Sequence, residues 1–163
     1  AAKLWEPYDI FWLEEPVNPG LADVQAELRK KTKIPLASGE NEFRVEGFKY
    51  LFDQQAVDIA MPDIGRVGGI QETLDICCLA KNFNILVSPH NFSSGVLLAA
   101  TMHLMMAVNN VDLLEIDMSN NAVYHEFFVE PLKIENGFAF PSDRPGLGVE
   151  LDDKILDAYA EKN

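Results

Sequence analysis

The run Phe11-Trp12-Leu13-Glu14-Glu15-Pro16 decides how this chain is expected to fold. Three large apolar residues lead directly into two adjacent carboxylates, and a proline ends the run. A short apolar run that stops at such a breaker is typical of a buried strand. Because a buried carboxylate needs a partner, the acidic pair at the end of this strand either holds a cation or faces water at a rim.

The same pattern recurs four more times along the chain. Short apolar runs end in a polar residue at Glu40, Asp63, His90 and Glu115. Counted from Glu14, the intervals are 26, 23, 27 and 25 residues by subtraction of the residue numbers. A period of about 25 to 30 residues fits one strand, one helix and two short loops. Helical patterns fill the intervals, over residues 21–31, 44–54, 70–81 and 95–107.

Alternating strands and helices with short loops favour a parallel sheet, which is either an open doubly wound sheet or a barrel. The barrel is favoured because its functional side chains come from the carboxyl ends of several strands. The glycine fingerprint of a nucleotide-binding open sheet is absent, since Gly65, Gly68 and Gly69 have the wrong spacing. The predicted fold class is therefore α/β, the C-terminal part of a TIM-like barrel with about five of its eight parallel strands.

The period is lost after Glu115. Short strands near residues 127–129, 132–134 and 138–140, followed by a terminal helix over 152–162, indicate a capping extension. The predicted division is a partial barrel in residues 1–118 and a C-terminal extension in 119–163. The chain opens in what resembles the last turn of a helix, so we expect it to begin inside a longer fold.

The helical patterns also predict which faces are buried. In 21–31 and in 44–54, apolar residues at helical spacing form an inward stripe, and the two cysteines of 70–81 are expected to be core thiols. The residues concerned are Leu21, Val24 and Leu28, then Phe48, Leu51 and Phe52, then Cys77 and Cys78.

Composition excludes several classes of protein. A formal net charge of −13 leaves no basic patch for nucleic acid. No apolar run approaches the roughly 20 residues that cross a bilayer, so no membrane association is expected. The two cysteines are adjacent in sequence and are expected to be reduced, which favours a cytoplasmic location.

The strand-end residues suggest two kinds of chemistry. Glu14 and Glu40 would end neighbouring strands, where two carboxylates can converge on a hard cation such as Mg²⁺. The alternative is that both face water on the rim. Glu15 stays open: it binds a substrate hydroxyl, supports Glu14, or points away.

Asp63 and His90 would end the next two strands. A carboxylate that orients an imidazole makes a general base, although an isolated pair of this kind is as often structural. Glu115 is a candidate acid or hydrogen-bond donor, and its alternative role is an ion pair with a cation such as Arg66. His103, inside an apolar helix, is interpreted as structural.

These motifs, in this order, resemble the enolase superfamily and more narrowly its mandelate racemase/muconate lactonizing enzyme family. The resemblance rests on Phe-Trp-Leu-Glu14-Glu15-Pro, Ala-Ser-Gly-Glu40-Asn, Met-Pro-Asp63 with Gly68-Gly69-Ile70, Ser-Pro-His90, Leu-Leu-Glu115 and the late Arg-Pro-Gly-Leu-Gly-Val. It implies a (β/α)7β barrel, Glu14 and Glu40 as two of three Mg²⁺ ligands, Asp63 and His90 as the dyad of the mandelate racemase subgroup, and Glu115 as the electrophilic acid. Arg66 stands where the muconate lactonizing subgroup carries a catalytic lysine, which argues against that subgroup.

The resemblance also implies a reaction: removal of the proton α to a carboxylate, through an enediolate stabilised by the metal. Dehydration of an acid sugar is favoured over racemisation of a 2-hydroxy acid. The family's third metal ligand, its lysine base and its N-terminal capping domain have no counterpart here, so we expect a fragment that forms a homo-oligomer or pairs with the missing N-terminal part. The alternative is a catalytically inactive truncated barrel that serves as an oligomeric binding or structural protein.

Overall fold

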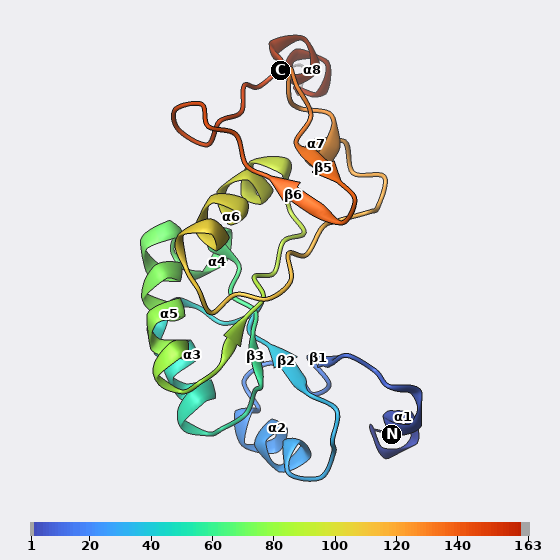
Figure 1. The fold of residues 1–163 in the computed structure, drawn as a ribbon, viewed down its shortest axis with the longest axis vertical. Coiled ribbons are helices and arrows are strands. Elements are labelled where there is room, and N and C mark those ends of the chain that lie inside the picture. The colour runs from blue at the N-terminus through green and yellow to red at the C-terminus, as the bar shows by residue number, and fades with distance from the viewer. Residues whose placement is uncertain (1, 161–163) are drawn as a thin grey trace. The chain divides into compact units, whose positions relative to one another are not determined.

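Strands and helices alternate in the computed structural model, which describes residues 2–160 (Figure 1). The chain starts with α1 (Ala2–Trp5) and the 3-10 helix η1 (Glu6–Tyr8), and continues through β1 (Leu13–Glu14), α2 (Ala22–Arg29), β2 (Leu36–Ser38), α3 (Arg44–Asp53), β3 (Ile59–Ala60), α4 (Ile64–Val67), α5 (Ile70–Asn82) and β4 (Leu86–Val87). It ends with α6 (Gly95–Ala107), α7 (Ala122–His125), β5 (Lys133–Glu135), β6 (Phe138–Phe140) and α8 (Asp153–Tyr159).

The chain divides into two compact units that interleave in sequence. The first consists of residues 2–90 with Val108–Leu113, and the second of Asn91–Ala107 with residues 114–160. The predicted division into a partial barrel in residues 1–118 and a C-terminal extension in 119–163 stays a prediction.

The first unit is built on one parallel sheet in which the strands follow chain order, β1-β2-β3-β4. Its register pairs Leu13 with Leu36, Ala37 with Ile59, and Ala60 with Val87. A parallel bridge from Val87 to Val111 is what the described residues form of the predicted fifth strand. Because all strands run the same way, their carboxyl ends lie at one edge of the sheet.

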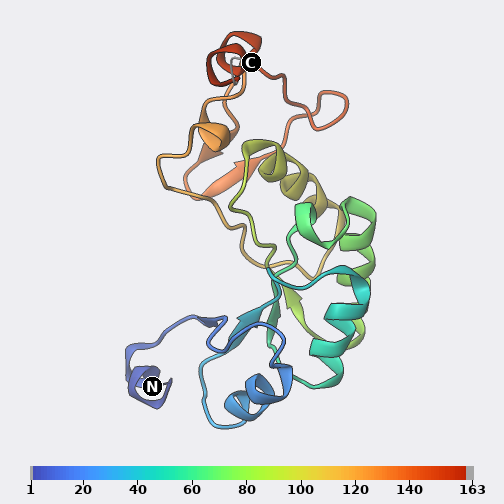
Figure 2. The same cartoon turned by 180° about the vertical axis from the view of Figure 1, so that it is seen from behind.

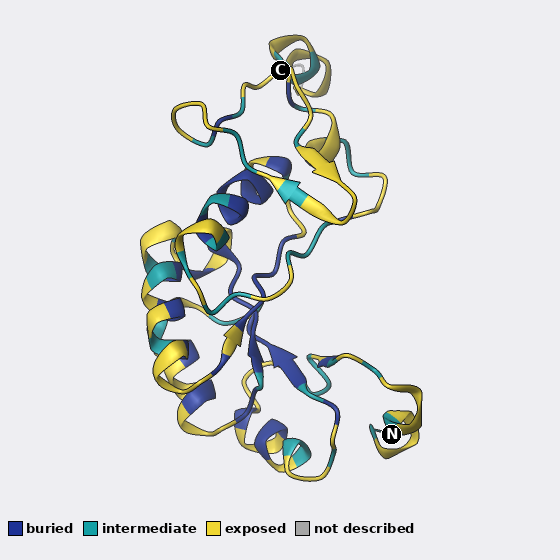
Figure 3. Ribbon diagram, viewed as in Figure 1, coloured by how far each residue is buried: buried dark blue, intermediate teal, exposed yellow. Residues whose placement is uncertain are grey.

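Helices α3 and α5 lie side by side along one face of this sheet (Figures 1 and 2). As predicted, α3 buries Phe48, Leu51 and Phe52. The rings of Phe48 and Phe52 meet edge to face, with centroids 6.0 Å apart. Burial of each such ring contributes about 1.5–3 kcal/mol. All residues of β2 and β3 are buried (Figure 3).

Two predicted faces are wrong in part, although Leu28 of α2 is partly buried against the core as predicted. Leu21 and Val24 remain 43% and 47% exposed, and α2 instead buries Gln25 together with two alanines. The Gln25 Nε2 donates a hydrogen bond to the Ala56 carbonyl at 3.1 Å, which compensates for burying the amide. On α5, Cys77 is buried but Cys78 is exposed, so only one of the two is a core thiol.

The second unit combines α6 with an antiparallel hairpin, β5–β6. Leu98 and Met102 of α6 pack with Tyr124 in a small core. A Cβ on Gly95 would lie 2.5 Å from the Tyr124 carbonyl oxygen, so α6 can begin this close to α7 only with glycine. Helix α6 is strongly apolar but has 13 residues, and within residues 2–160 no helix combines the length and apolarity needed to cross a bilayer.

We predict that the two thiols differ sharply in reactivity. Burial raises the pKa of the Cys77 thiol to about 11, whereas Cys78 is exposed. Since the thiolate is the reactive form, Cys77 stays protonated at about pH 8 and ionises only as the pH approaches its raised pKa. Titration with a chromogenic disulfide should modify one thiol in the native protein and both after unfolding in urea.

The control is Cys78→Ser, which should leave the native protein unreactive at the same pH. Rapid modification of native Cys78→Ser protein would contradict the buried placement of Cys77.

Candidate active site

Four of the predicted site residues follow the four parallel strands at the same edge of the sheet. Each lies at the carboxyl end of its strand or within three residues of it: Glu14 ends β1, and Glu40, Asp63 and His90 follow β2, β3 and β4. The parallel register therefore brings these side chains to one edge, as the sequence predicts. Their chemical roles stay predictions.

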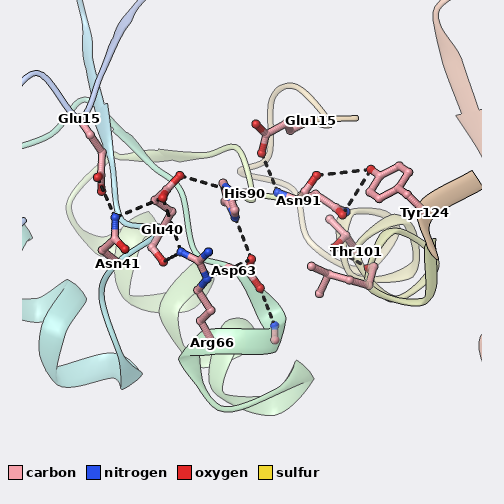
Figure 4. A network of polar contacts seen from close by, with 12 residues as sticks. Glu15, Glu40, Asn41, Asp63, Arg66, His90, Asn91, Thr101, Glu115 and Tyr124 are labelled. Carbon is pink, nitrogen blue, oxygen red and sulfur yellow. Dashed lines mark hydrogen bonds and ion pairs between the residues drawn. The ribbon is translucent and has the colours of Figure 1, made fainter. Parts of the chain in front are cut away.

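Asp63 and His90 form a buried pair (Figure 4). The Nδ1 of His90 lies 2.8 Å from Oδ2 of Asp63, and the two residues are 6% and 1% exposed. The other oxygen of Asp63 accepts a 2.7 Å hydrogen bond from the Gly65 amide, so Asp63 also caps the amino terminus of α4. Helix α4 therefore holds the carboxylate in place, and the carboxylate fixes the imidazole ring.

The opposite edge of the imidazole faces Glu40. The Nε2 of His90 is 3.1 Å from Oε2 of Glu40. Arg66, one turn after Asp63, donates a 3.0 Å hydrogen bond to the Glu40 carbonyl and places its guanidinium 3.5 Å from Oε1 of Glu40 and 3.9 Å from Oδ2 of Asp63. The Arg66 guanidinium thus partly compensates the negative charge of the Glu40 and Asp63 carboxylates, which both contact the His90 ring.

A glycine determines how closely β2 approaches the helix layer just before Glu40. Gly39 has φ +140°, and a Cβ there would lie 2.6 Å from the ring of Phe48. Any larger residue would push the strand end away from α3. Gly39 therefore fixes the position of the backbone that carries Glu40.

Glu14 is exposed, and its Oε2 accepts a 3.2 Å hydrogen bond from the indole Nε1 of Trp12. Two carboxylates on paired strands are the oxygen donors that Mg²⁺ prefers, so Glu14 and Glu40 have suitable chemistry for this ion. Within residues 2–160, no three His, Cys, Asp or Glu side chains gather closely enough to hold a metal. A complete ligand set would need at least one further donor.

Glu115, the fifth predicted residue, belongs to the second unit. Its Oε2 accepts a 2.6 Å hydrogen bond from the backbone amide of Asn91, the residue that follows His90 in the chain. The Tyr124 hydroxyl reaches both the carbonyl and the Oδ1 of Asn91 at 3.4 Å, and burial raises the pKa of Tyr124 to about 12. The alternative expectation, an ion pair with Arg66, stays a prediction; within the first unit Arg66 approaches Glu40 and Asp63.

Sequence reasoning missed the side chains that connect the predicted residues. Asn41 contacts both Glu15 and Glu40, and Arg66 contacts both Glu40 and Asp63. The available signal was proximity in sequence: Asn41 follows Glu40 directly, and Arg66 stands three residues after Asp63 on a helical turn. Glu15, whose role the sequence leaves open, turns its carboxylate toward Asn41 and Ser38, and its role stays a prediction.

The chain is similar to known proteins in both sequence and structure. Residues 1–155 match the family model for the enolase C-terminal domain-like proteins. The chain belongs to the enolase superfamily. The match confirms the predicted resemblance and, with the parallel sheet, the predicted fold class as the C-terminal part of a barrel.

Individual members show how similar the chain is. It is 38% identical to D-xylonate dehydratase of Haloferax volcanii over 154 residues, which are 94% of this chain and 37% of that protein. It superposes with a TM-score of 0.92 and 38% identity on 3,6-anhydro-D-galactonate cycloisomerase of Zobellia galactanivorans, covering 99% of this chain and 46% of that one. An enolase from Agrobacterium radiobacter with bound Na and L-malate gives a TM-score of 0.89 and 30% identity, over 96% of this chain and 43% of that one. The chain therefore spans less than half of each of these three proteins.

We predict that Asp63→Ala destabilises the first unit by about 1–3 kcal/mol, because it removes the cap of α4 and the carboxylate that contacts Nδ1 of the buried His90 ring. Asp63→Asn should cost less, since its amide oxygen can still accept from Gly65. Urea unfolding followed by circular dichroism measures both changes.

Asp152→Ala is the matched control, because Asp152 caps α8 without a buried histidine. Its effect should be smaller than that of Asp63→Ala. Equal losses in the two alanine variants would show that the bond to His90 contributes nothing to stability.

Proposed function

We propose that this chain carries the proton-transfer side of a magnesium-dependent enzyme that removes the proton α to a carboxylate of an acid sugar. The observation that carries the proposal is the buried Asp63–His90 pair, in which the second ring nitrogen, Nε2, lies 3.1 Å from Oε2 of Glu40, a carboxylate of the candidate metal site. Dehydration is the favoured outcome, and racemisation of a 2-hydroxy acid is the second. D-xylonate dehydratase, at 38% identity, supports the first of these.

The metal assignment rests on donor chemistry. Members of the enolase superfamily generally bind Mg²⁺. Glu14 and Glu40 would hold this ion as two of its protein ligands, with water, substrate and a further ligand completing the shell. When bound, the ion would supply positive charge that stabilises the negative charge developing on the substrate carboxylate.

The protein groups then divide the proton chemistry. Asp63 would hold the imidazole of His90 in one orientation, so that Nε2 exchanges a proton with the substrate. In dehydration, this proton is either taken from the α carbon or given to the leaving β-hydroxyl. Glu115 would be the acid that faces the substrate carboxylate; in this structure its carboxylate is fixed by the Asn91 amide.

A non-catalytic role is the second candidate. Strand β1 ends the sheet, and nearby Phe11 is 61% exposed, so a further strand or a second copy could pair there. This role would make the chain an oligomeric binding or structural protein. A cytoplasmic location stays a prediction under both candidates.

We predict that Mg²⁺ changes the fluorescence of Trp12, because its indole is hydrogen-bonded to Glu14. In a Trp5→Phe background Trp12 is the single tryptophan, since the sequence contains two. Titration with Mg²⁺ should give a saturable change, and Glu14→Gln or Glu40→Gln should weaken the apparent affinity by about tenfold or more.

Glu46→Gln is the control for charge, since it removes an exposed carboxylate of α3. If Glu46→Gln weakened binding as much as Glu40→Gln, the signal would report general electrostatic screening and not a site at Glu14 and Glu40.

We predict that His90→Asn lowers any dehydratase activity by about 10²–10⁴-fold, measured at saturating Mg²⁺. The assay incubates the protein with Mg²⁺ and a panel of acid sugars and detects 2-keto-3-deoxy products. His103→Asn is the control, because His103 lies in the second unit, where its Nε2 is 3.2 Å from the Leu147 carbonyl oxygen. Activity that survives in His90→Asn would remove His90 from the mechanism.

If the wild-type chain is inactive in this assay, an N-terminally extended form of the protein distinguishes the two candidate functions. If an N-terminally extended form is active, the chain supplies part of an enzyme. If the extended form is also silent, the non-catalytic role is favoured.

A further inference from the structure

A series of side-chain hydrogen bonds beside the candidate metal site has no part in the proposed mechanism. Glu15, next to Glu14, accepts a 2.8 Å hydrogen bond from Nδ2 of Asn41 and a 3.4 Å contact from the Ser38 hydroxyl. The same Nδ2 of Asn41 lies 3.2 Å from Oε1 of Glu40 (Figure 4). Asn41 therefore links the carboxylates of Glu15 and Glu40.

The backbone of Glu15 is held in an unfavourable conformation. Its φ is +38°, in the left-handed region that residues other than glycine rarely adopt. Such strain costs on the order of 1–3 kcal/mol and persists where surrounding contacts compensate for it. Here the Glu15 amide donates to the Ala37 carbonyl at 3.0 Å, and the side chain is tied to Asn41 and Ser38.

We infer that Glu15 and Asn41 are positioning residues that orient the Glu40 carboxylate for a divalent cation. This inference rests on the proposed function. Asn41 has two amide protons, so it can donate to Glu15 and Glu40 at once and fix the rotamer of Glu40. Outer partners of this kind typically change metal affinity 10–100-fold when removed.

The chemistry of the linking residue supports a metal over other ligands. The neighbourhood is acidic: Asn41 donates to two carboxylates, those of Glu15 and Glu40, and Glu14 precedes Glu15 directly in the chain. A lysine or arginine at position 41 would orient Glu40 equally well but would neutralise it and repel a cation. Asparagine donates hydrogen bonds without adding charge, so the negative potential is kept for an ion of opposite sign.

The positional role predicts a graded response to substitution. Asn41→Ala and Glu15→Ala should each weaken Mg²⁺ binding by about tenfold or more, because Glu40 loses its fixed orientation. Glu15→Gln should stay within about threefold of the wild type, since its amide oxygen still accepts from Asn41. If Glu15 acted only through its charge, Gln and Ala at this position would weaken binding equally.

The experiment is a Mg²⁺ titration of the single-tryptophan protein, followed by Trp12 fluorescence and repeated by calorimetry. Glu42→Gln is the matched control, because it removes a neighbouring carboxylate and leaves the Glu15–Asn41–Glu40 contacts intact. Thermal unfolding without metal verifies that each variant is folded, and binding is compared only between folded proteins.

The outcomes separate this inference from the proposed function. Weak binding in both alanine variants, with Glu15→Gln and Glu42→Gln near the wild type, supports the positioning role. Wild-type affinity in Asn41→Ala overturns it and leaves the proposed metal site standing. A wild-type chain that binds no Mg²⁺ overturns the metal site and this inference together.

Discussion

Parallel pairing of β1 to β4 is the constraint on which the rest of this structure depends. Each strand is only two or three residues long, yet the register is continuous from Leu13–Leu36 to Ala60–Val87. A shift of one residue in any strand would turn its terminal side chain to the other face of the sheet. All residues of β2 and β3 are buried, so such a shift would be costly because it would exchange side chains of different size between closely packed positions. Chemistry at the strand ends is therefore held in place by packing in the strands.

This dependence explains which features were predictable from sequence. The spacing of Glu14, Glu40, Asp63 and His90 reflects the strand–helix repeat, so it predicts both the parallel sheet and the shared edge. The inward face of α3 follows from three large side chains with no alternative burial. The face of α2 does not, because Leu21 and Val24 compete with two alanines and Gln25 for one surface. The alanines are buried there, and the Gln25 amide donates a hydrogen bond to the Ala56 carbonyl, a contact that no local sequence pattern predicts.

The lateral contacts of the site were equally hidden. Asn41 and Arg66 connect side chains that come from different strands and turns. A sequence pattern considered one strand at a time does not predict such contacts. Asp63 is a second example of a contact that the sequence pattern does not predict. Its position predicts a partner for His90, but its second bond, to the Gly65 amide, appears only once α4 is known to begin there. One carboxylate thus joins the start of a helix to the orientation of an imidazole.

The balance of charge at the strand ends follows from these shared contacts. In the structure, the Glu40 carboxylate is approached by His90, Arg66 and Asn41. These three donors differ in what they would do to a divalent cation: Arg66 opposes it, Asn41 is neutral, and His90 is neutral or cationic according to its protonation. A divalent cation held by Glu40 would therefore share this carboxylate with Arg66, whose guanidinium lies 3.5 Å from Oε1. The hydrogen bond from Arg66 to the Glu40 carbonyl anchors the guanidinium between Glu40 and Asp63, so a single side chain partly compensates the negative charge of both.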